Sequence, residues 1–179
     1  ERPPVLSFHF GLPSADRITA FRSAGIVLMA TAVSLRDALA AQEAGIDAVV
    51  AQGIEAGGHR GVIDVAERDE GQGVLTLTRT LVRKLHVPVV AAGGIMDGAG
   101  VAAVLALGAA AAQMGTAFVG CPESAADAGY RLALASGVDG RTTLTTVISG
   151  RPARGFRNAL TDLGDQTGAP PSPGYPMTY

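Results

Sequence analysis

The chain is organised around one glycine-rich stretch, Ala51-Gln52-Gly53-Ile54-Glu55-Ala56-Gly57-Gly58-His59-Arg60-Gly61. It directly follows an apolar segment, Ile46 to Val50, which we expect to be a buried strand. Its glycines allow the backbone to approach a ligand closely or to adopt a positive φ. Its lone histidine, His59, can exchange protons near neutral pH. A glycine-rich loop of this kind after a buried strand predicts a functional loop of an α/β protein.

Short apolar runs recur on both sides of this stretch. They begin at residues 5, 26, 48, 89 and 111, so successive starts are 21, 22, 41 and 22 residues apart. Each run is continuously apolar, which is typical of strands that are buried on both faces of a parallel sheet. The runs are Val5–Phe8, Ile26–Met29, Ala48–Ala51, Val89–Ala92 and Ala111–Met114.

Helical patterns lie between most of the apolar runs. A strand–helix alternation with a period near 22 residues predicts right-handed βαβ units with parallel strands. Ser34, with Asp37 three residues later, is a variant of the capping box, and Gly45 is expected to end the same helix. The expected helices cover residues 15–24, 34–45, 75–85, 98–107 and 123–135.

The interval of 41 residues is almost two periods long but contains one convincing helix. The residues of this interval that the helix does not account for form a loop over Gln52–Gly73. Structureless loops of this length are usually functional or disordered. Because this loop carries the glycine-rich stretch with His59, we expect it to be functional. Its charged middle, Asp64–Glu70, is expected to be solvated.

The composition fits one soluble globular domain with a sizeable core, because 47% of the 179 residues are hydrophobic and 17% are charged. The net charge of −2 gives no electrostatic basis for binding nucleic acid or an anionic membrane. The longest apolar stretch, residues 101–114, is too short to span a bilayer. A single cysteine, Cys121, and the lack of a visible export signal predict a cytoplasmic protein.

Two further glycine-containing segments end predicted strands. They are Ala91-Ala92-Gly93-Gly94-Ile95 and Gln113-Met114-Gly115-Thr116. Backbone N–H groups of two adjacent glycine loops, with the hydroxyl of Thr116, predict a phosphate-binding site. In (β/α)₈ barrels this site commonly follows strands seven and eight, so the first three strands would then be absent from the chain. The alternative is that these glycines only permit tight strand–helix turns.

Several polar residues near the predicted strand ends are candidates for chemistry. His59 is the catalytic or ligand-contacting candidate, with a solvent-facing loop residue as the alternative. Gln52 ends a buried strand, where its amide needs a partner that a ligand could supply. His9 lies at the end of the first run and is a further candidate for the same end of the predicted barrel. Glu55 and Arg60 are expected to form an ordering ion pair or to be solvated. No metal site is predicted, because no histidine pairs with Glu or Cys at ligand spacing.

The stretch over residues 51–61 resembles the signature of nitronate monooxygenases, formerly called 2-nitropropane dioxygenases. Other segments match the family in the same order along nearly the whole chain: Ser7–Gly11, Ala91–Ile95, Gln113–Phe118 and Ser149-Gly150-Arg151-Pro152-Ala153-Arg154. The resemblance implies an α/β fold of the parallel (β/α)₈ TIM-barrel type, with about five βα units in this chain. It implies an FMN flavoprotein, an oxidoreductase that uses O₂ to oxidise alkyl nitronates to carbonyl compounds and nitrite.

The resemblance also assigns roles by position. His59 matches the family's catalytic histidine, and it is the candidate base for removing the α-proton of a neutral nitroalkane, whereas a nitronate needs no base. The implied FMN contacts are Gln52, Gly57, Gly58, Gly93, Gly94, Gln113, Met114, Gly115 and Thr116.

Two other functions remain open. FMN-dependent enoyl-ACP reductases have a similar Glu-Ala-Gly-Gly-His loop and phosphate cradle, although Gln52, Arg60 and Gly150–Arg154 favour the nitronate enzyme. The third possibility is a catalytically silent, truncated barrel fragment. Bound flavin would separate the two enzymes from the fragment.

The resemblance implies that residues 1–148 are the C-terminal part of an FMN-binding TIM barrel. Residues 149–179 are expected to be a Gly/Pro/Arg-rich loop and an extended tail. The family's first strands and a final segment have no counterpart here, so we expect a piece of a longer barrel. Open sheet edges would then favour self-association, or the missing strands would come from another segment.

Overall fold

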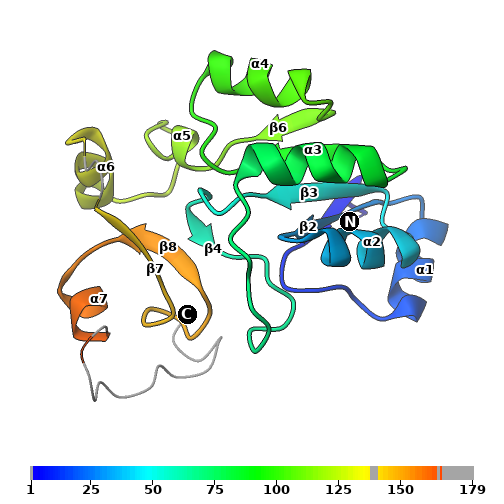
Figure 1. The fold of residues 1–179 in the computed structure, drawn as a ribbon, viewed down its shortest axis with the longest axis horizontal. Coiled ribbons are helices and arrows are strands. Elements are labelled where there is room, and N and C mark those ends of the chain that lie inside the picture. The colour runs from blue at the N-terminus through cyan, green and yellow to red at the C-terminus, as the bar shows by residue number, and fades with distance from the viewer. Residues whose placement is uncertain (1, 138–140, 165, 167–179) are drawn as a thin grey trace. The chain divides into compact units, whose positions relative to one another are not determined.

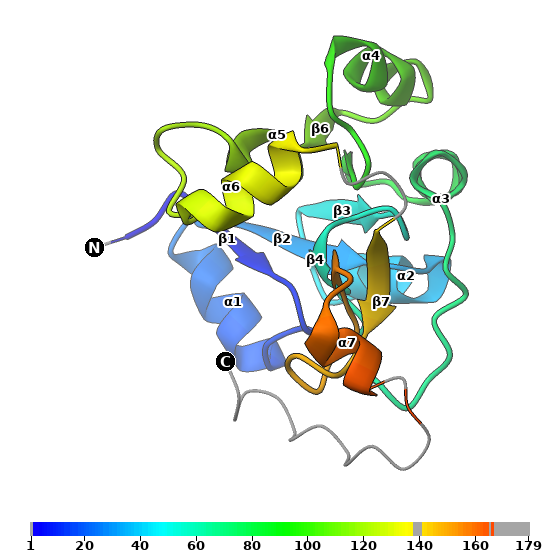
Figure 2. The ribbon, with the colours of Figure 1, turned by 90° about the vertical axis from the view of Figure 1, so that its left-hand side faces the viewer.

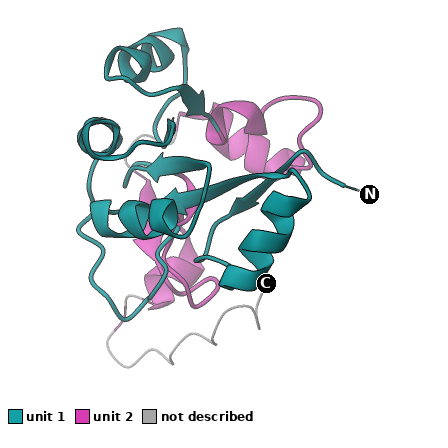
Figure 3. Cartoon of the chain, turned by 90° about the vertical axis from the view of Figure 1, so that its right-hand side faces the viewer, with its two compact units in different colours: residues 1–56, 61–114 teal, residues 57–60, 115–179 magenta. Residues whose placement is uncertain are grey.

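The computed structural model describes residues 2–137, 141–164 and 166. They form two compact units, coloured separately in Figure 3. The first unit comprises residues 1–56 and 61–114, and the second comprises residues 57–60 and 115–179. Within the described ranges, every helix is too short or too polar to cross a membrane.

The first unit is built on a five-stranded parallel sheet whose strands follow the order of the sequence (Figure 1). The predicted parallel α/β fold is confirmed. The register aligns Gln52 with Ala92 and Ala92 with Gln113, so the three residues end their strands at one edge of the sheet, as predicted. The strands are β1 (Val5–Phe8), β2 (Val27–Ala32), β3 (Ala48–Gln52), β5 (Val89–Ala92) and β6 (Ala111–Gln113).

The helices of the first unit lie where the sequence predicted them. They are α1 (Ala15–Ser23), α2 (Leu35–Glu43), α3 (Val74–Lys84) and α4 (Gly98–Ala106). Helix α1 packs on β2, and α2 packs on β2 and β3 (Figure 2). The predicted cap of α2 forms, because the Asp37 N–H donates to Ser34 Oγ at 3.1 Å.

The main core of the first unit lies between the sheet and its helices. Leu28 on β2 and Val49 on β3 are fully buried, as are Leu77 and Leu81 on α3. The spacing of four residues puts both leucines on one face of α3. Burial of each such side chain contributes about 1.5–3 kcal/mol, so this face holds α3 against the sheet.

The second unit contains an antiparallel sheet that the sequence analysis did not predict. Its strands are β4 (Gly58–His59), β7 (Thr142–Thr145) and β8 (Ala153–Phe156), in the order β4-β8-β7. Two residues are too few to show an alternating pattern, and the partner of β4 is remote in the sequence. Local pattern therefore could not reveal this sheet.

Three helices complete the second unit: α5 (Thr116–Val119), α6 (Ala128–Ala135) and α7 (Ala159–Gly164). The helix expected over 123–135 begins only at Ala128, because Asp127 caps it by accepting from the Tyr130 N–H at 2.8 Å. Residues 149–164 are not the loop and extended tail that we expected, since they contain β8 and α7. Pairing with β4 and β7 makes β8 a strand. The proline-rich end, residues 168–179, lies outside the described residues.

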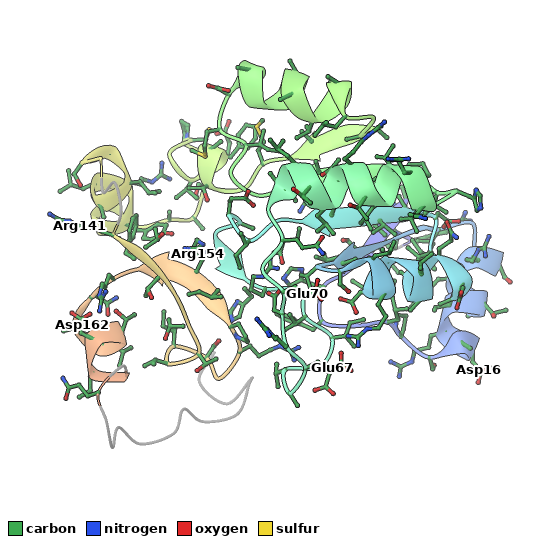
Figure 4. All side chains as sticks on the ribbon, viewed as in Figure 1. Asp16, Glu67, Glu70, Arg141, Arg154 and Asp162 are labelled. Atoms are coloured by element: carbon green, nitrogen blue, oxygen red, sulfur yellow. The ribbon has the colours of Figure 1, made fainter. Side chains whose placement is uncertain are left out.

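The charged segment Asp64–Glu70 is mostly exposed, as expected. Figure 4 shows Glu67 and Glu70 projecting from this loop. The Glu67 carboxylate accepts a hydrogen bond from the exposed Arg36 guanidinium and raises the pKa of that group, first through the hydrogen bond and then through charge attraction. The pair ties the loop to α2 within the first unit.

Candidate functional site

Gln52 is 6% exposed at the end of β3 and forms part of the architecture of the glycine-rich loop. Its Oε1 accepts a hydrogen bond from the Gly61 N–H at 2.8 Å. The next residue, Gly53, donates its N–H to the carbonyl oxygen of Ala92 at 2.9 Å. The buried Oε1 atom, which a ligand could have satisfied, therefore has its partner within the loop itself.

Gly61 brings the loop back to the ends of β1 and β2. A Cβ added at Gly61 would lie 2.5 Å from Thr31 Cγ2 and 3.2 Å from the carbonyl oxygen of His9. Nδ1 of His9 lies 3.0 Å from Thr31 Oγ1, within hydrogen-bond distance. The candidate His9 thus lies at the same edge of the first unit as Gln52.

Glu55 caps α3. Both of its carboxylate oxygens accept from the Val74 N–H, at 3.0 and 2.9 Å. The N-cap position of this helix is Gly73, which has no side chain to do so. A carboxylate at a helix N-terminus typically contributes about 0.3–1 kcal/mol. Glu55 is exposed, in agreement with the solvated alternative, and the cap is a structural role that the sequence analysis did not assign.

Gly93 and Gly94 form the turn after β5, and both have positive φ, +112° and +68°. A Cβ at Gly93 would lie 2.9 Å from the backbone nitrogen of Ala56, and one at Gly94 would lie 3.0 Å from Glu55 Cβ. Packing and backbone conformation therefore require glycine at both positions. This favours the tight-turn interpretation for the pair, independently of any ligand.

In the second unit, β4 and β8 join two motifs that are far apart in the sequence. His59 is in register with Ala153, and the Arg60 N–H donates to the carbonyl oxygen of Pro152 at 2.8 Å. Arg60 is 0% exposed, so of the two alternatives expected for its side chain, an ordering ion pair or solvation, solvation is wrong. On β8, Nη1 of Arg154 donates to Thr142 Oγ1 at 3.2 Å.

His59 is held by a buried hydroxyl. Its Nε2 lies 2.7 Å from Oγ of Ser149, which is 0% exposed. The Arg151 N–H lies 3.4 Å from the same oxygen, so the hydroxyl is constrained from a second side. The sequence analysis quoted Ser149 within a motif but gave it no role. Nothing local could have assigned one, because 90 residues separate it from His59.

The three glycines of the second unit that are predicted site residues, Gly57, Gly58 and Gly115, differ in their surroundings. A Cβ on Gly57 would lie 2.9 Å from Thr116 Oγ1, so these two predicted site residues are neighbours. No atom lies within 4 Å of a Cβ added to Gly58 or Gly115. Gly58 belongs to strand β4, whereas Gly115 lies in the turn before α5, where open backbone N–H groups are suited to binding anions.

The predicted site residues are thus divided between the two units. Gln52, Gly93, Gly94, Gln113 and Met114 belong to the first, whereas Gly57, Gly58, His59, Gly115 and Thr116 belong to the second. In the part of the chain that the structure describes, no three His, Cys, Asp or Glu side chains are grouped to hold a metal ion. The groups available for chemistry are the imidazole ring of His59, which Ser149 holds, and the backbone of the open glycines Gly58 and Gly115.

Known proteins resemble the chain over its entire length. Residues 1–175 match the family described as nitronate monooxygenase. Curated nitronate monooxygenases of Paraburkholderia phytofirmans and Pseudomonas aeruginosa are 55% and 51% identical over 179 residues. These matches cover 100% of this chain and 49% and 51% of the two relatives. The chain therefore spans about half the length of the curated relatives it matches.

Solved structures show the same relationship. A nitroalkane oxidase from Streptomyces ansochromogenes has a TM-score of 0.82 at 46% identity, covering 88% of this chain and 46% of that one. FabK from Thermotoga maritima has a TM-score of 0.75 at 34% identity, covering 89% of this chain and 48% of that one. The resemblance found in the sequence and the parallel TIM-barrel type of fold are confirmed.

The turn after β5 yields a stability test. We expect Gly93→Ala to lower the free energy of unfolding of the whole protein by about 1–3 kcal/mol, because its φ of +112° strains any L side chain. Gly98→Ala is the control, since no atom lies within 4 Å of its Cβ and its φ is not positive. It should change the stability by less than about 0.5 kcal/mol. Equal urea midpoints for the two variants would contradict the packing argument.

Proposed function

Because the chain belongs to the nitronate monooxygenase family, we propose that the whole protein is an FMN-dependent oxidoreductase of alkyl nitronates and nitroalkanes. It uses O₂ to form carbonyl compounds and nitrite. The observation that carries the proposal is the 2.7 Å contact between His59 and Ser149, which joins two of the family's motifs around an oriented imidazole. The single cysteine supports a cytoplasmic location, and the weak net charge supports small-molecule substrates over nucleic acid.

One geometric feature of the described residues is compatible with FMN: two glycines leave open space beside the backbone. No neighbouring atom lies within 4 Å of a Cβ added to Gly58 or Gly115, so there is room for a ligand to approach the backbone at both residues. We assign the phosphate to the N–H groups of Gly94, Gly115 and Thr116. Other contacts are assigned to Gln52, Gly57, Gly58, Gly93, Gln113 and Met114. When bound, FMN supplies the electron acceptor, and the protein orients it.

His59 is the proposed base. A neutral nitroalkane must lose a proton from its α-carbon before it can react as a nitronate, and the imidazole accepts that proton. The Ser149 hydroxyl holds the His59 ring through Nε2. Because the ring is already oriented, it loses less rotational freedom when the substrate binds. A preformed nitronate is already an anion and does not use this step.

The two alternatives are distinguished by direct assays on the purified whole protein. Oxygen uptake with a nitronate supports the proposal. If the protein instead oxidises NAD(P)H with a crotonyl thioester as the substrate, the result would favour an enoyl-ACP reductase-like enzyme. A protein without flavin absorbance that does not take up added FMN would favour the silent fragment.

Replacing His59 separates proton abstraction from binding. His59→Ala is expected to lower kcat/KM for a neutral nitroalkane by about 10²- to 10⁴-fold, the usual range for a general base. The loss with the preformed nitronate should be much smaller, and steady-state oxygen uptake measures both. Equal losses on the two substrates would contradict the role as base.

Ser149→Ala tests the support of the ring. Removing one hydrogen bond of about 0.5–1.5 kcal/mol should lower kcat/KM for the neutral nitroalkane about two- to tenfold. Ser136→Ala serves as the control, because this exposed serine donates to the nearby Ala133 carbonyl oxygen of α6. An unchanged rate in Ser149→Ala would show that the hydroxyl does not help to orient His59.

The open glycine after β6 gives a cleaner test of the cofactor than Gly94, whose replacement strains the backbone. Gly115→Ala should weaken FMN binding about tenfold or more, a change of about 1.4 kcal/mol, by blocking close approach of the phosphate. Its φ of −104° accepts alanine without strain. Gly98→Ala, equally open and without a positive φ, is the matched control, because Gly98 belongs to α4 and not to the loop after α5. Fluorescence titration of the apoprotein measures both, and equal affinities would place the phosphate elsewhere.

A further inference from the structure

Helix α5 is too short to be stable by its own hydrogen bonds. It contains four residues, Thr116–Val119, and begins directly after Gly115. Nucleating a helical turn costs more free energy than so few hydrogen bonds return. Contacts outside α5 must therefore hold it, and with it the turn at Gly115 and Thr116.

Arg131 on α6 provides such contacts. Its guanidinium donates hydrogen bonds to the backbone carbonyl oxygens of four residues in the loop after α5. Nε donates to Ala126 at 3.0 Å, Nη1 to Gly120 at 3.0 Å and to Cys121 at 2.8 Å, and Nη2 to Ser124 at 2.5 Å. Arginine suits this arrangement because its donors are fixed in one plane. A charged donor also makes each bond stronger than a neutral one would.

A short chain of hydrogen bonds links this loop to the glycine turn. The Cys121 N–H donates to the carbonyl oxygen of Phe118 at 3.1 Å. The Phe118 N–H in turn donates to the carbonyl oxygen of Gly115 at 2.9 Å. Arg131 therefore supports the end of α5 that lies opposite Gly115, and the intervening residues transmit that support.

We propose that Arg131 is a positioning residue for the phosphate group of the cofactor. It does so without touching the phosphate, by ordering the loop over 120–126 and thereby the N–H groups of Gly115 and Thr116. Groups that are ordered before binding lose less conformational entropy when they bind, so affinity for the phosphate should depend on Arg131. This inference rests on the proposed function, because it takes FMN as the ligand of that turn.

The test compares FMN with riboflavin, which lacks the phosphate, in titrations of the whole apoprotein. Arg131→Lys keeps the charge but cannot reach four carbonyl groups from one nitrogen. We expect it to weaken FMN binding about tenfold, as for the loss of one or more charge-assisted hydrogen bonds, with riboflavin binding changed less than about twofold. The ³¹P resonance of bound FMN should broaden or shift as well.

Two further variants guard against a general effect on folding. Arg131→Gln retains a planar donor group but is shorter and uncharged, so it should weaken FMN binding at least as much as the lysine variant. Arg79→Lys is the matched control, because this exposed arginine donates to one carbonyl oxygen, that of Leu107, at 3.2 Å. It should leave both affinities unchanged.

The outcomes separate this inference from the proposed function. If Arg131→Lys weakens FMN and riboflavin equally, or weakens neither, Arg131 does not position the phosphate, although FMN can still be the cofactor. If the unmodified protein binds neither flavin, the cofactor itself is wrong, and the role of Arg131 is overturned with it.

Discussion

Close backbone packing at the ends of β3 and β5 is the constraint on which the glycine-rich loop depends. A Cβ at Gly53 would lie 2.5 Å from the Val74 nitrogen, one at Gly61 would lie 2.5 Å from Thr31 Cγ2, and one at Gly93 would lie 2.9 Å from the Ala56 nitrogen. Side chains at these positions would force the backbone apart. Glycine therefore fixes the loop on both sides of residues 57–60, which belong to the second unit and contain β4.

The glycines of the motifs consequently serve two physical purposes. Gly93 and Gly94 are required by their backbone conformation and their neighbours, so ligand binding need not explain them. Gly58 and Gly115 have open space where a Cβ would be, which leaves room for a ligand to approach their backbone. A motif can therefore identify a family correctly while most of its glycines stabilise the fold.

Residues that touch neither substrate nor cofactor carry much of the proposed preorganisation. The fully buried Ser149 holds the ring of His59, and Arg131 donates hydrogen bonds to four carbonyl oxygens of one loop. Both act by restricting motion in groups that a proton or a phosphate would meet. Such restriction matters because a small misplacement of a reacting group costs a large factor in rate.

Local pattern in the sequence was sufficient for the five parallel strands, the helices between them and the Ser34 cap, since apolar periodicity and capping act between near neighbours. The motifs were likewise sufficient for the family. The pairing of β4 with β8, the capping of α3 by Glu55 and the bonds made by Ser149 and Arg131 were decided only in the tertiary structure. Each of these joins groups that folding brings together, and two residues of β4 or one serine carry no periodic signal of where their partner lies.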